Sequence, residues 1–209
     1  VDFARSGDLG PSLGRQTGYN HGVKQYVASA IRYRPQRFSE VLGQTASVKV
    51  LQNAIRLNRI AKVYLFSGPR GTGKTTLGRL LAKALNCDDL PRQLASMELP
   101  DPCDVCRSCI GIRSSNDPEV LEIDAASHNG VDDMREMMQI ASQQPKAGKW
   151  RIVILDEAHS LTKEAQNALL KLAEEPPDSF LMILCTTDPE KLLPTIRSRC
   201  SRFAVKPLP

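Results

Sequence analysis

The run GPRGTGKTT at residues 68–76 constrains the fold of this chain more than any other feature. It matches the pattern G-x-x-x-x-G-K-[ST], in which a glycine-rich loop follows a buried strand and opens a helix. A short apolar run at residues 63–66 precedes it, and a helical pattern over residues 74–85 follows it. The context therefore predicts a phosphate-binding loop in an α/β domain; the alternative is a glycine-rich turn that matches by chance.

The loop offers separate groups for phosphate and for metal. Its glycines let backbone N–H groups turn toward phosphate oxygens, and the following helix N-terminus adds a partial positive charge. Lys74 can reach the β- and γ-phosphates, and the Thr75 hydroxyl can ligate Mg²⁺. The residues predicted to contact a nucleotide are Gly68, Pro69, Arg70, Gly71, Thr72, Gly73, Lys74, Thr75 and Thr76.

The run IVILDEAH at residues 152–159 delivers two carboxylates to the end of an apolar segment. Asp156 would hold Mg²⁺ directly or through water, and Glu157 would polarise the attacking water. An acidic helix start is the alternative, because Asp and Glu favour that position. The letters DEAH also occur in a helicase family, but those enzymes need two motor lobes and this chain has room for one.

Other segments alternate between strand and helix patterns. Strands are expected at residues 63–66, 120–123, 151–155, 180–186 and 202–205, and helices around residues 48–55, 74–85, 131–141 and 162–174. This alternation predicts a layered α/β fold with a mainly parallel sheet. Thr186, Thr187 and Asp188 follow the fourth strand, where a hydroxyl could sense the γ-phosphate or its water; a turn cap is the alternative.

Four cysteines lie between the phosphate-binding loop and the acidic run, at Cys87, Cys103, Cys106 and Cys109. Two-residue gaps let successive thiolates converge on one ion, and Cys87 can close a tetrahedral site. Four thiolates without histidine favour Zn²⁺ or an iron–sulfur centre, and nothing else in the sequence suggests redox chemistry. We expect a structural zinc, with an iron–sulfur centre and unmetallated thiols or disulfides as alternatives. Cys185 lies in a strand pattern and is expected in the core.

Bulk properties add limited constraints. The net charge of +5 permits nucleic-acid contact without requiring it. No apolar run approaches the roughly 20 residues of a membrane span. Residues 1–23 are polar and aperiodic, so we expect a flexible tail there and globular sequence from Lys24 onward. With no export signal, a cytoplasmic protein is expected, and its cysteines are better explained as ligands or buried thiols than as disulfides.

Several motifs together resemble one family, the gamma/tau subunits of bacterial DNA polymerase III, which drive the replicative clamp loader. The resemblance covers roughly residues 25–209 and concerns their N-terminal ATPase module. Besides the phosphate-binding loop and DEAH run, it rests on YRPQRFSEVLGQ at 33–44, LAKALNC at 81–87, PCDVCRSC at 102–109, EIDAAS at 122–127, EAQNALLKLAEEPP at 164–177 and CTTDPEKLLPTIRSRC at 185–200.

The resemblance implies an AAA+ domain with a RecA-like, five-stranded sheet of order 5-1-4-3-2 and ATP as its nucleotide. The domain would span residues 24–209, with an inserted zinc-binding module at residues 87–119, called the cysteine module below. By position in the family motif, the residues near the adenine and ribose would be Tyr33, Arg34, Pro35, Val41 and Gly43.

The resemblance also implies roles in catalysis and assembly. Thr187 or its neighbour would be sensor 1, and Arg199 would be an arginine finger that serves a neighbouring subunit's ATP. A guanidinium there can offset charge on the transferring phosphoryl group; a surface arginine that caps a helix end is the alternative. Implied partners are other clamp-loader subunits, the sliding clamp and primer-template DNA, with no membrane.

Candidate contact residues for these partners are less well defined. Lys163 and Asn167 are candidates for DNA contact, with a solvated helix face as the alternative. Residues 134–145 are a candidate for clamp contact, although Met137, Met138 and Ile140 are better explained as core positions. The chain ends after the fifth strand, before the family's second domain and collar. We therefore expect an oligomer in the full-length context, and weak activity from a monomeric fragment.

Two other functional hypotheses stay open at this point. The chain could hold ATP and zinc as a scaffold without independent ATPase activity, although a scaffold could lose Glu157 or Arg199 and this chain keeps both. A DEAH-type helicase lobe is disfavoured by the chain length and by the cysteines. A clamp-loader ATPase accounts for the motifs together.

Overall fold

A five-stranded parallel sheet forms the centre of the fold in a computed structural model that describes residues 33–146 and 148–208. The strand order is β2-β3-β4-β1-β5, and every pairing among the described strands is parallel. This confirms the predicted order 5-1-4-3-2. The strands are β1 (Val63–Ser67), β2 (Val120–Asp124), β3 (Arg151–Asp156), β4 (Phe180–Thr186) and β5 (Ser201–Ala204).

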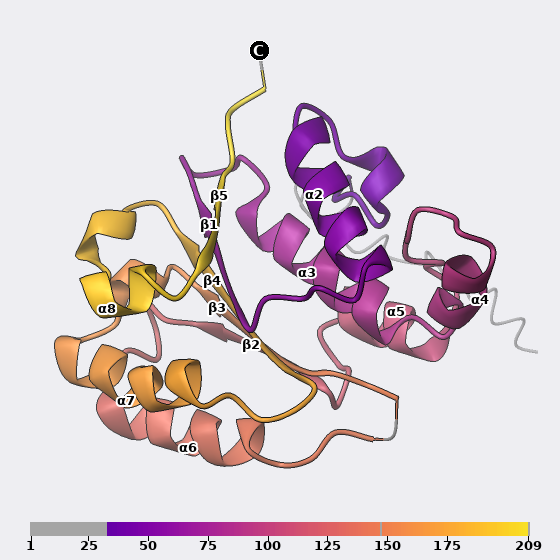
Figure 1. The fold of residues 1–209 in the computed structure, drawn as a ribbon. Coiled ribbons are helices and arrows are strands. Elements are labelled where there is room, and N and C mark those ends of the chain that lie inside the picture. The colour runs from indigo at the N-terminus through magenta and orange to yellow at the C-terminus, as the bar shows by residue number, and fades with distance from the viewer. Residues whose placement is uncertain (1–32, 147, 209) are drawn as a thin grey trace, which may run out of the picture. The chain divides into compact units, whose positions relative to one another are not determined.

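Helices cover both faces of the sheet (Figure 1). One face carries α2, α3 and α5, with α4 beside α5, and the other carries α6, α7 and α8. The helices are α2 (Thr45–Arg56), α3 (Lys74–Asn86), α4 (Leu90–Ala95), α5 (Arg107–Arg113), α6 (Val131–Ala141), α7 (Lys163–Glu174) and α8 (Pro194–Arg197); short 3₁₀ turns are η1 (Phe38–Glu40), η2 (Ala158–Ser160) and η3 (Pro189–Lys191).

Alternating side chains of the strands build two cores, one on each face. In β1, Tyr64 and Phe66 point toward α2 and α3, whereas Val63 and Leu65 join the core under α6 and α7. The period of two follows from strand geometry, and burial on both faces explains the continuous apolar runs of the central strands β1, β3 and β4. On the first face, the ring centroids of Phe66 and Phe203 lie 5.4 Å apart, which fixes β5 against β1.

Helix α3 packs closely on the sheet because Gly78 faces it. A methyl group at Gly78 would lie 3.1 Å from Cγ2 of Ile183 in β4. The small residue therefore lets the helix that starts at the phosphate-binding loop lie directly over the central strands. This contact holds the loop in a fixed position at the carboxyl end of β1.

The long elements follow the sequence prediction, and the short ones do not. Helices α4, α5 and α8 have six, seven and four residues and were not predicted, because one or two turns carry too little periodicity to recognise. The fifth strand runs over Ser201–Ala204, one residue earlier than predicted. The predicted flexible tail at residues 1–23 lies outside the described residues. Over the described part of the chain, no helix has the length and apolar character needed to span a bilayer.

Candidate functional site

The phosphate-binding loop connects β1 to α3 at the carboxyl edge of the sheet. Gly68 enters it at φ 154°, and a Cβ there would lie 2.1 Å from the backbone oxygen of Val205. Only glycine allows this approach of β5 to the loop. Gly71 and Gly73 have φ values of 79° and 97°, in the left-handed region, with no heavy atom within 4 Å of a Cβ placed on either. The loop thus combines one crowded glycine with two that border open space.

Lys74 and Thr75 begin α3 directly beneath this loop. Lys74 is 6 % exposed, and its Nζ donates a hydrogen bond of 2.9 Å to the carbonyl oxygen of Pro69. The Lys74 ammonium group therefore points into the phosphate-binding loop. The Thr72 hydroxyl donates to the same carbonyl over 2.8 Å. Arg70 is exposed, and Thr76 is partly buried on the first turn of α3.

The two predicted magnesium ligands lie side by side. The Thr75 hydroxyl donates a 2.7 Å hydrogen bond to Oδ2 of Asp156, which brings α3 and the end of β3 together although they are 81 residues apart in sequence. A hydroxyl and a carboxylate at this separation, next to a lysine and open glycine backbone, are the oxygen donors that Mg²⁺ with a nucleotide phosphate prefers. The donor set therefore fits a magnesium–nucleotide complex.

Glu157 is held in an uncommon backbone conformation beside Asp156. Its φ is 48°, in the left-handed region, and its backbone N–H donates to Asp156 Oδ1 over 2.9 Å. Its Oε2 is buried and has no hydrogen-bond partner among the described residues. The nearest basic group is Nδ1 of His159, 3.6 Å away. Backbone strain and a buried carboxylate oxygen without a protein partner are both typical of functional sites, where a ligand or a water can bond to that oxygen.

His159 is a site residue that sequence reasoning did not single out. Its Nδ1 lies 3.1 Å from the Thr186 hydroxyl as well as 3.6 Å from Glu157. Thr186 is fully buried, and its hydroxyl also accepts the backbone N–H of Asp188 over 3.0 Å. Thr187, the predicted sensor, is exposed at the end of β4. His159 is the last residue of the DEAH run, so the sequence contained it. Only the fold shows that its ring lies between the Glu157 carboxylate and the Thr186 hydroxyl at the end of β4.

The predicted adenine and ribose residues occupy several environments. Pro35 and Val41 are partly buried, Val41 against the core under α2 and α3. Gly43 has φ 70°, and Tyr33 is 74 % exposed. Burial, then the Arg79 charge, lowers the pKa of Arg34, whereas Glu122 and Asp156 oppose that shift.

The charges of Arg79, Glu122 and Asp156 all act on the Arg34 guanidinium. Arg79 on α3 itself pairs with Glu122 in β2 at 2.7 Å.

Arg199 lies at the opposite edge of the sheet. Strand β5 pairs in parallel with β1, Ser201 opposite Tyr64 and Ala204 opposite Ser67. Arg199 precedes β5 whereas the phosphate-binding loop follows β1, so the length of β5, about 13 Å at about 3.3 Å per residue, separates them. Its guanidinium pairs with Glu174 at 2.7 Å and donates to the Thr195 carbonyl at 2.7 Å. Arg199 is thus remote from its own loop.

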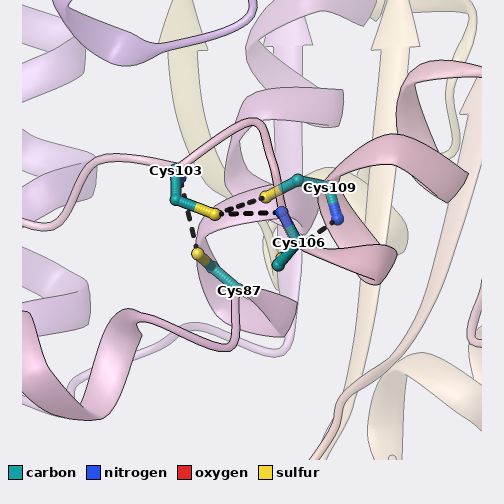
Figure 2. Close-up of side chains that lie close together, drawn as sticks. All are labelled: Cys87, Cys103, Cys106 and Cys109. Carbon is teal, nitrogen blue, oxygen red and sulfur yellow. Dashed lines mark hydrogen bonds between the residues drawn. The ribbon is translucent and has the colours of Figure 1, made fainter.

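The four cysteines of the module converge on one point (Figure 2). Their Sγ atoms all lie within 4.8 Å of one another, and all four are free thiols. Cys103 and Cys109 sulfurs are 4.0 Å apart, far beyond the roughly 2.05 Å of a disulfide. A tetrahedral zinc with bonds of about 2.3 Å needs sulfurs near this spacing. The cluster therefore fits zinc.

The surroundings of the sulfurs favour negative charge. The backbone N–H groups of Cys103, Cys106 and Cys109 point at the sulfurs of Cys87, Cys103 and Cys106 over 3.5, 3.3 and 3.4 Å. A hydrogen bond from Cys109 lowers the pKa of Cys87 to about 5, and the same contact together with burial raises the pKa of Cys109. The cluster therefore favours the thiolate form of Cys87, and a bound cation would favour the thiolate form of all four cysteines.

The other predicted contact residues divide between surface and core. Lys163 and Asn167 are exposed on one side of α7, four residues apart. Met134 and Met137 are 0 % and 2 % exposed in the core under α6, and Met138 packs against it. Met137 and Met138 thus take the core positions that were their alternative. Cys185 is buried in β4 as expected.

Comparison of this chain with known proteins finds matches among the subunits of DNA polymerase III. Residues 43–209 match the family model described as DNA polymerase III, delta subunit. The chain is 46 % identical to DNA polymerase III subunit tau of Bacillus subtilis, over 83 % of this chain and 30 % of that protein. It is 42 % identical to subunit tau of Escherichia coli, over 88 % of this chain and 27 % of that protein. The chain thus spans less than a third of these relatives.

A solved structure supports the fold alone. The Holliday junction branch migration motor RuvB of Thermotoga maritima matches with a TM-score of 0.53 at 19 % identity, covering 84 % of this chain and 48 % of that one. At this identity the likeness shows a shared fold and carries no activity from one protein to the other.

Proposed function

The chain belongs to the family described as DNA polymerase III, delta subunit, with tau subunits among its relatives, and from this membership we propose that it is the ATP-binding and hydrolysing module of a replicative clamp loader. ATP binding would favour closure of a subunit ring on the sliding clamp, and hydrolysis would release the clamp on primed DNA. A cytoplasmic location belongs to the same proposal.

One observation carries the proposal: the Thr75 hydroxyl and the Asp156 carboxylate meet at 2.7 Å beside the phosphate-binding loop. Thr75 and Asp156 would hold Mg²⁺ there, directly or through water, and the metal would neutralise phosphate charge. Lys74 would turn its ammonium from the Pro69 carbonyl toward the β- and γ-phosphates. The open backbone at Gly71 and Gly73 would supply N–H donors.

Glu157 is the residue best suited to orient and polarise the attacking water. Its buried Oε2 has no partner among the described residues and lies 3.6 Å from the His159 ring, so a water at that oxygen would satisfy it. The Thr186 hydroxyl, 3.1 Å from the same ring, and Thr187 follow at the end of β4. This arrangement supports a sensor role for the Thr186–Thr187 pair, which would respond to the γ-phosphate.

Arg199 would complete the site of a neighbouring subunit. It lies at the far edge of the sheet from its own loop, in an exposed ion pair with Glu174. Exposed ion pairs contribute about 0–1 kcal/mol, so exchanging the Glu174 partner for a phosphate would cost little. Catalysis would then require assembly with other loader subunits.

The test compares ATP binding by the chain with turnover in the assembly. The chain should bind ATP–Mg²⁺ and hydrolyse it slowly, and turnover by full-length protein with its partner subunits, clamp and primed DNA should be about 10³-fold faster or more, since an arginine finger contributes about 10³–10⁵. Lys74→Ala should abolish binding in the chain and turnover in the assembly. No ATP binding by the chain would overturn the proposal, and binding without turnover in the assembly would indicate a scaffold.

A further inference from the structure

The cysteine module is bonded to the segment that leads into the nucleotide site. Asp101 of the module accepts the Phe38 backbone N–H at 2.6 Å and the Ser39 hydroxyl at 2.7 Å. Arg37 donates through Nη2 to the Cys103 carbonyl at 2.7 Å. These contacts join residues more than 60 positions apart in sequence. The Gln36 and Arg37 backbone N–H groups bond locally to Glu40, and the module adds long-range bonds that fix residues 37–39 relative to the rest of the domain.

A buried lysine ties the same segment to the helix of the phosphate-binding loop. Lys83 of α3 is 1 % exposed, and its Nζ donates to Asp104 of the module at 2.6 Å. The same Nζ donates to the carbonyl and the side-chain oxygen of Gln36 at 3.2 and 2.9 Å. Helix α3, segment and module therefore meet at one ammonium group. A buried ammonium needs such partners, so loss of any one of them would leave a poorly compensated buried charge where the three elements meet.

The geometry of these contacts depends on the cysteines. Cys103, whose carbonyl accepts Arg37, is itself one of the clustered thiols. Asp104 follows it at φ 59°, in the left-handed region, so its carboxylate reaches Lys83 from a strained turn. Asp101 is fixed from the other side by Gln93, through bonds of 2.8 and 2.9 Å. Closure of the thiol cluster by a metal would hold this turn in place.

Arg34 lies at the other end of this segment. Gln36 Nε2 donates to the Arg34 carbonyl over 2.8 Å, and the Gln36 carbonyl accepts the Lys83 hydrogen bond. Displacement of Gln36 would therefore act on the Arg34 backbone. The charges of Arg79 on α3 and of Asp156 act on the Arg34 guanidinium, so movement of residues 36–39 would alter the interaction between Arg34 and Asp156.

We propose that Asp101 and Lys83 are positioning residues through which the metal-loaded cysteine module holds residues 34–39 at the nucleotide site, so that loss of these contacts weakens ATP binding. The inference rests on the proposed function for its ligand. The cysteine module would thus position residues 34–39 within its own domain, in addition to any contact with another subunit.

Asp101 offers a test with a conservative rescue. Asp101→Ala removes both acceptors, whereas Asp101→Asn keeps an oxygen for the Phe38 N–H and leaves Ser39 free to rotate its hydroxyl. A fluorescent ATP analogue should bind Asp101→Ala about three- to tenfold more weakly and Asp101→Asn about as well as the unmodified chain, because the net contribution of a typical hydrogen bond corresponds to about that change in affinity. Arg92→Ala is the matched control: Arg92 pairs with Asp89 and Glu98 within the module, not with residues 36–39.

Hydrogen exchange separates this inference from the proposed function. In the nucleotide-free chain, residues 36–39 should exchange faster in Asp101→Ala, and after zinc chelation, than in Arg92→Ala, while β3 and β4 stay protected. Zinc content and the unfolding temperature are measured alongside, and unchanged values would show that Asp101→Ala keeps its fold. Lys83→Met should give the same faster exchange at residues 36–39. Unchanged exchange and unchanged affinity in Asp101→Ala would overturn the inference. Failure of the unmodified chain to bind ATP would instead overturn the proposed function.

Discussion

At the scale of single residues, Gly68 illustrates how a backbone contact shapes the candidate site. The Val205 oxygen lies 2.1 Å from the position a Cβ would take at Gly68, and this oxygen belongs to backbone that follows β5. A backbone atom cannot move aside as a flexible side chain can. The residue therefore couples the start of the phosphate-binding loop to the edge strand beside it.

Gly68→Ala should lower the free energy of unfolding by about 2–4 kcal/mol and weaken ATP binding, because β5 or the loop must shift. Gly71→Ala is the matched control: its φ is also positive, but no atom lies within 4 Å, so only the left-handed cost of about 1–2 kcal/mol applies. Urea unfolding followed by circular dichroism measures both. Equal losses in the two variants would show that the Val205 contact is not what requires glycine.

Cys200 gives a prediction in which pH matters. Burial raises the pKa of its thiol to about 11 from the ordinary 9.0. The thiolate is the reactive form, so at pH 8 its fraction should be about 100-fold lower than for an ordinary thiol. Iodoacetamide labelling of the native chain, followed by peptide mass spectrometry, should show slow modification of Cys200, accelerating up to about pH 11. Labelling as fast as that of a denatured control at pH 8 would contradict this.

At the scale of elements, the length of each segment decides how far sequence reasoning reaches. The central strands, which are buried on both faces, and helices of eleven to thirteen residues carry clear patterns, so their places in the sequence were predictable. The strand order 5-1-4-3-2 was implied by the resemblance to the gamma/tau subunits. Helices α4 and α5 were not predictable, because their folding depends on contacts with distant residues. The same holds for the site: motif spacing singled out Thr75 and Asp156, whereas His159 and Lys83 act through neighbours 27 and 47 residues away.

The cysteine module is the element whose composition gives the sharpest test. Because its four sulfurs lie within 4.8 Å of one another, the chain purified without chelator should carry about one zinc ion, as a closed Cys₄ site requires. Elemental analysis should find that Cys109→Ser loses most of the metal. Cys200→Ser is the control and should keep it, since Cys200 lies outside the cluster. Iron in place of zinc would support the iron–sulfur alternative, and no metal at all would contradict the site.

At the scale of the whole molecule, the sheet separates the residues proposed to bind ATP from the residue proposed to assist hydrolysis in a neighbouring subunit. Everything proposed to bind the phosphates lies at the carboxyl edge, after β1, β3 and β4, whereas Arg199 lies at the amino edge before β5. A parallel sheet cannot bring both edges to the same ligand, because they are separated by the length of the strands. On the proposed function, a single domain of this design would be complete for binding and incomplete for rapid hydrolysis, and a neighbouring subunit would supply the missing guanidinium.

This separation predicts that binding and turnover respond differently to Arg199. In the isolated chain, Arg199→Ala should leave ATP affinity within about twofold of the unmodified value, because the residue lies about 13 Å or more from its own loop. In the assembled loader, the same variant should lower turnover by about 10³-fold or more at the sites that Arg199 serves. Arg202→Ala is the matched control, an exposed arginine in β5 whose side chain donates to the Arg197 carbonyl, and it should leave both quantities unchanged. Reduced ATP affinity in the isolated Arg199→Ala chain would place this guanidinium at its own nucleotide and contradict a role in a neighbouring site.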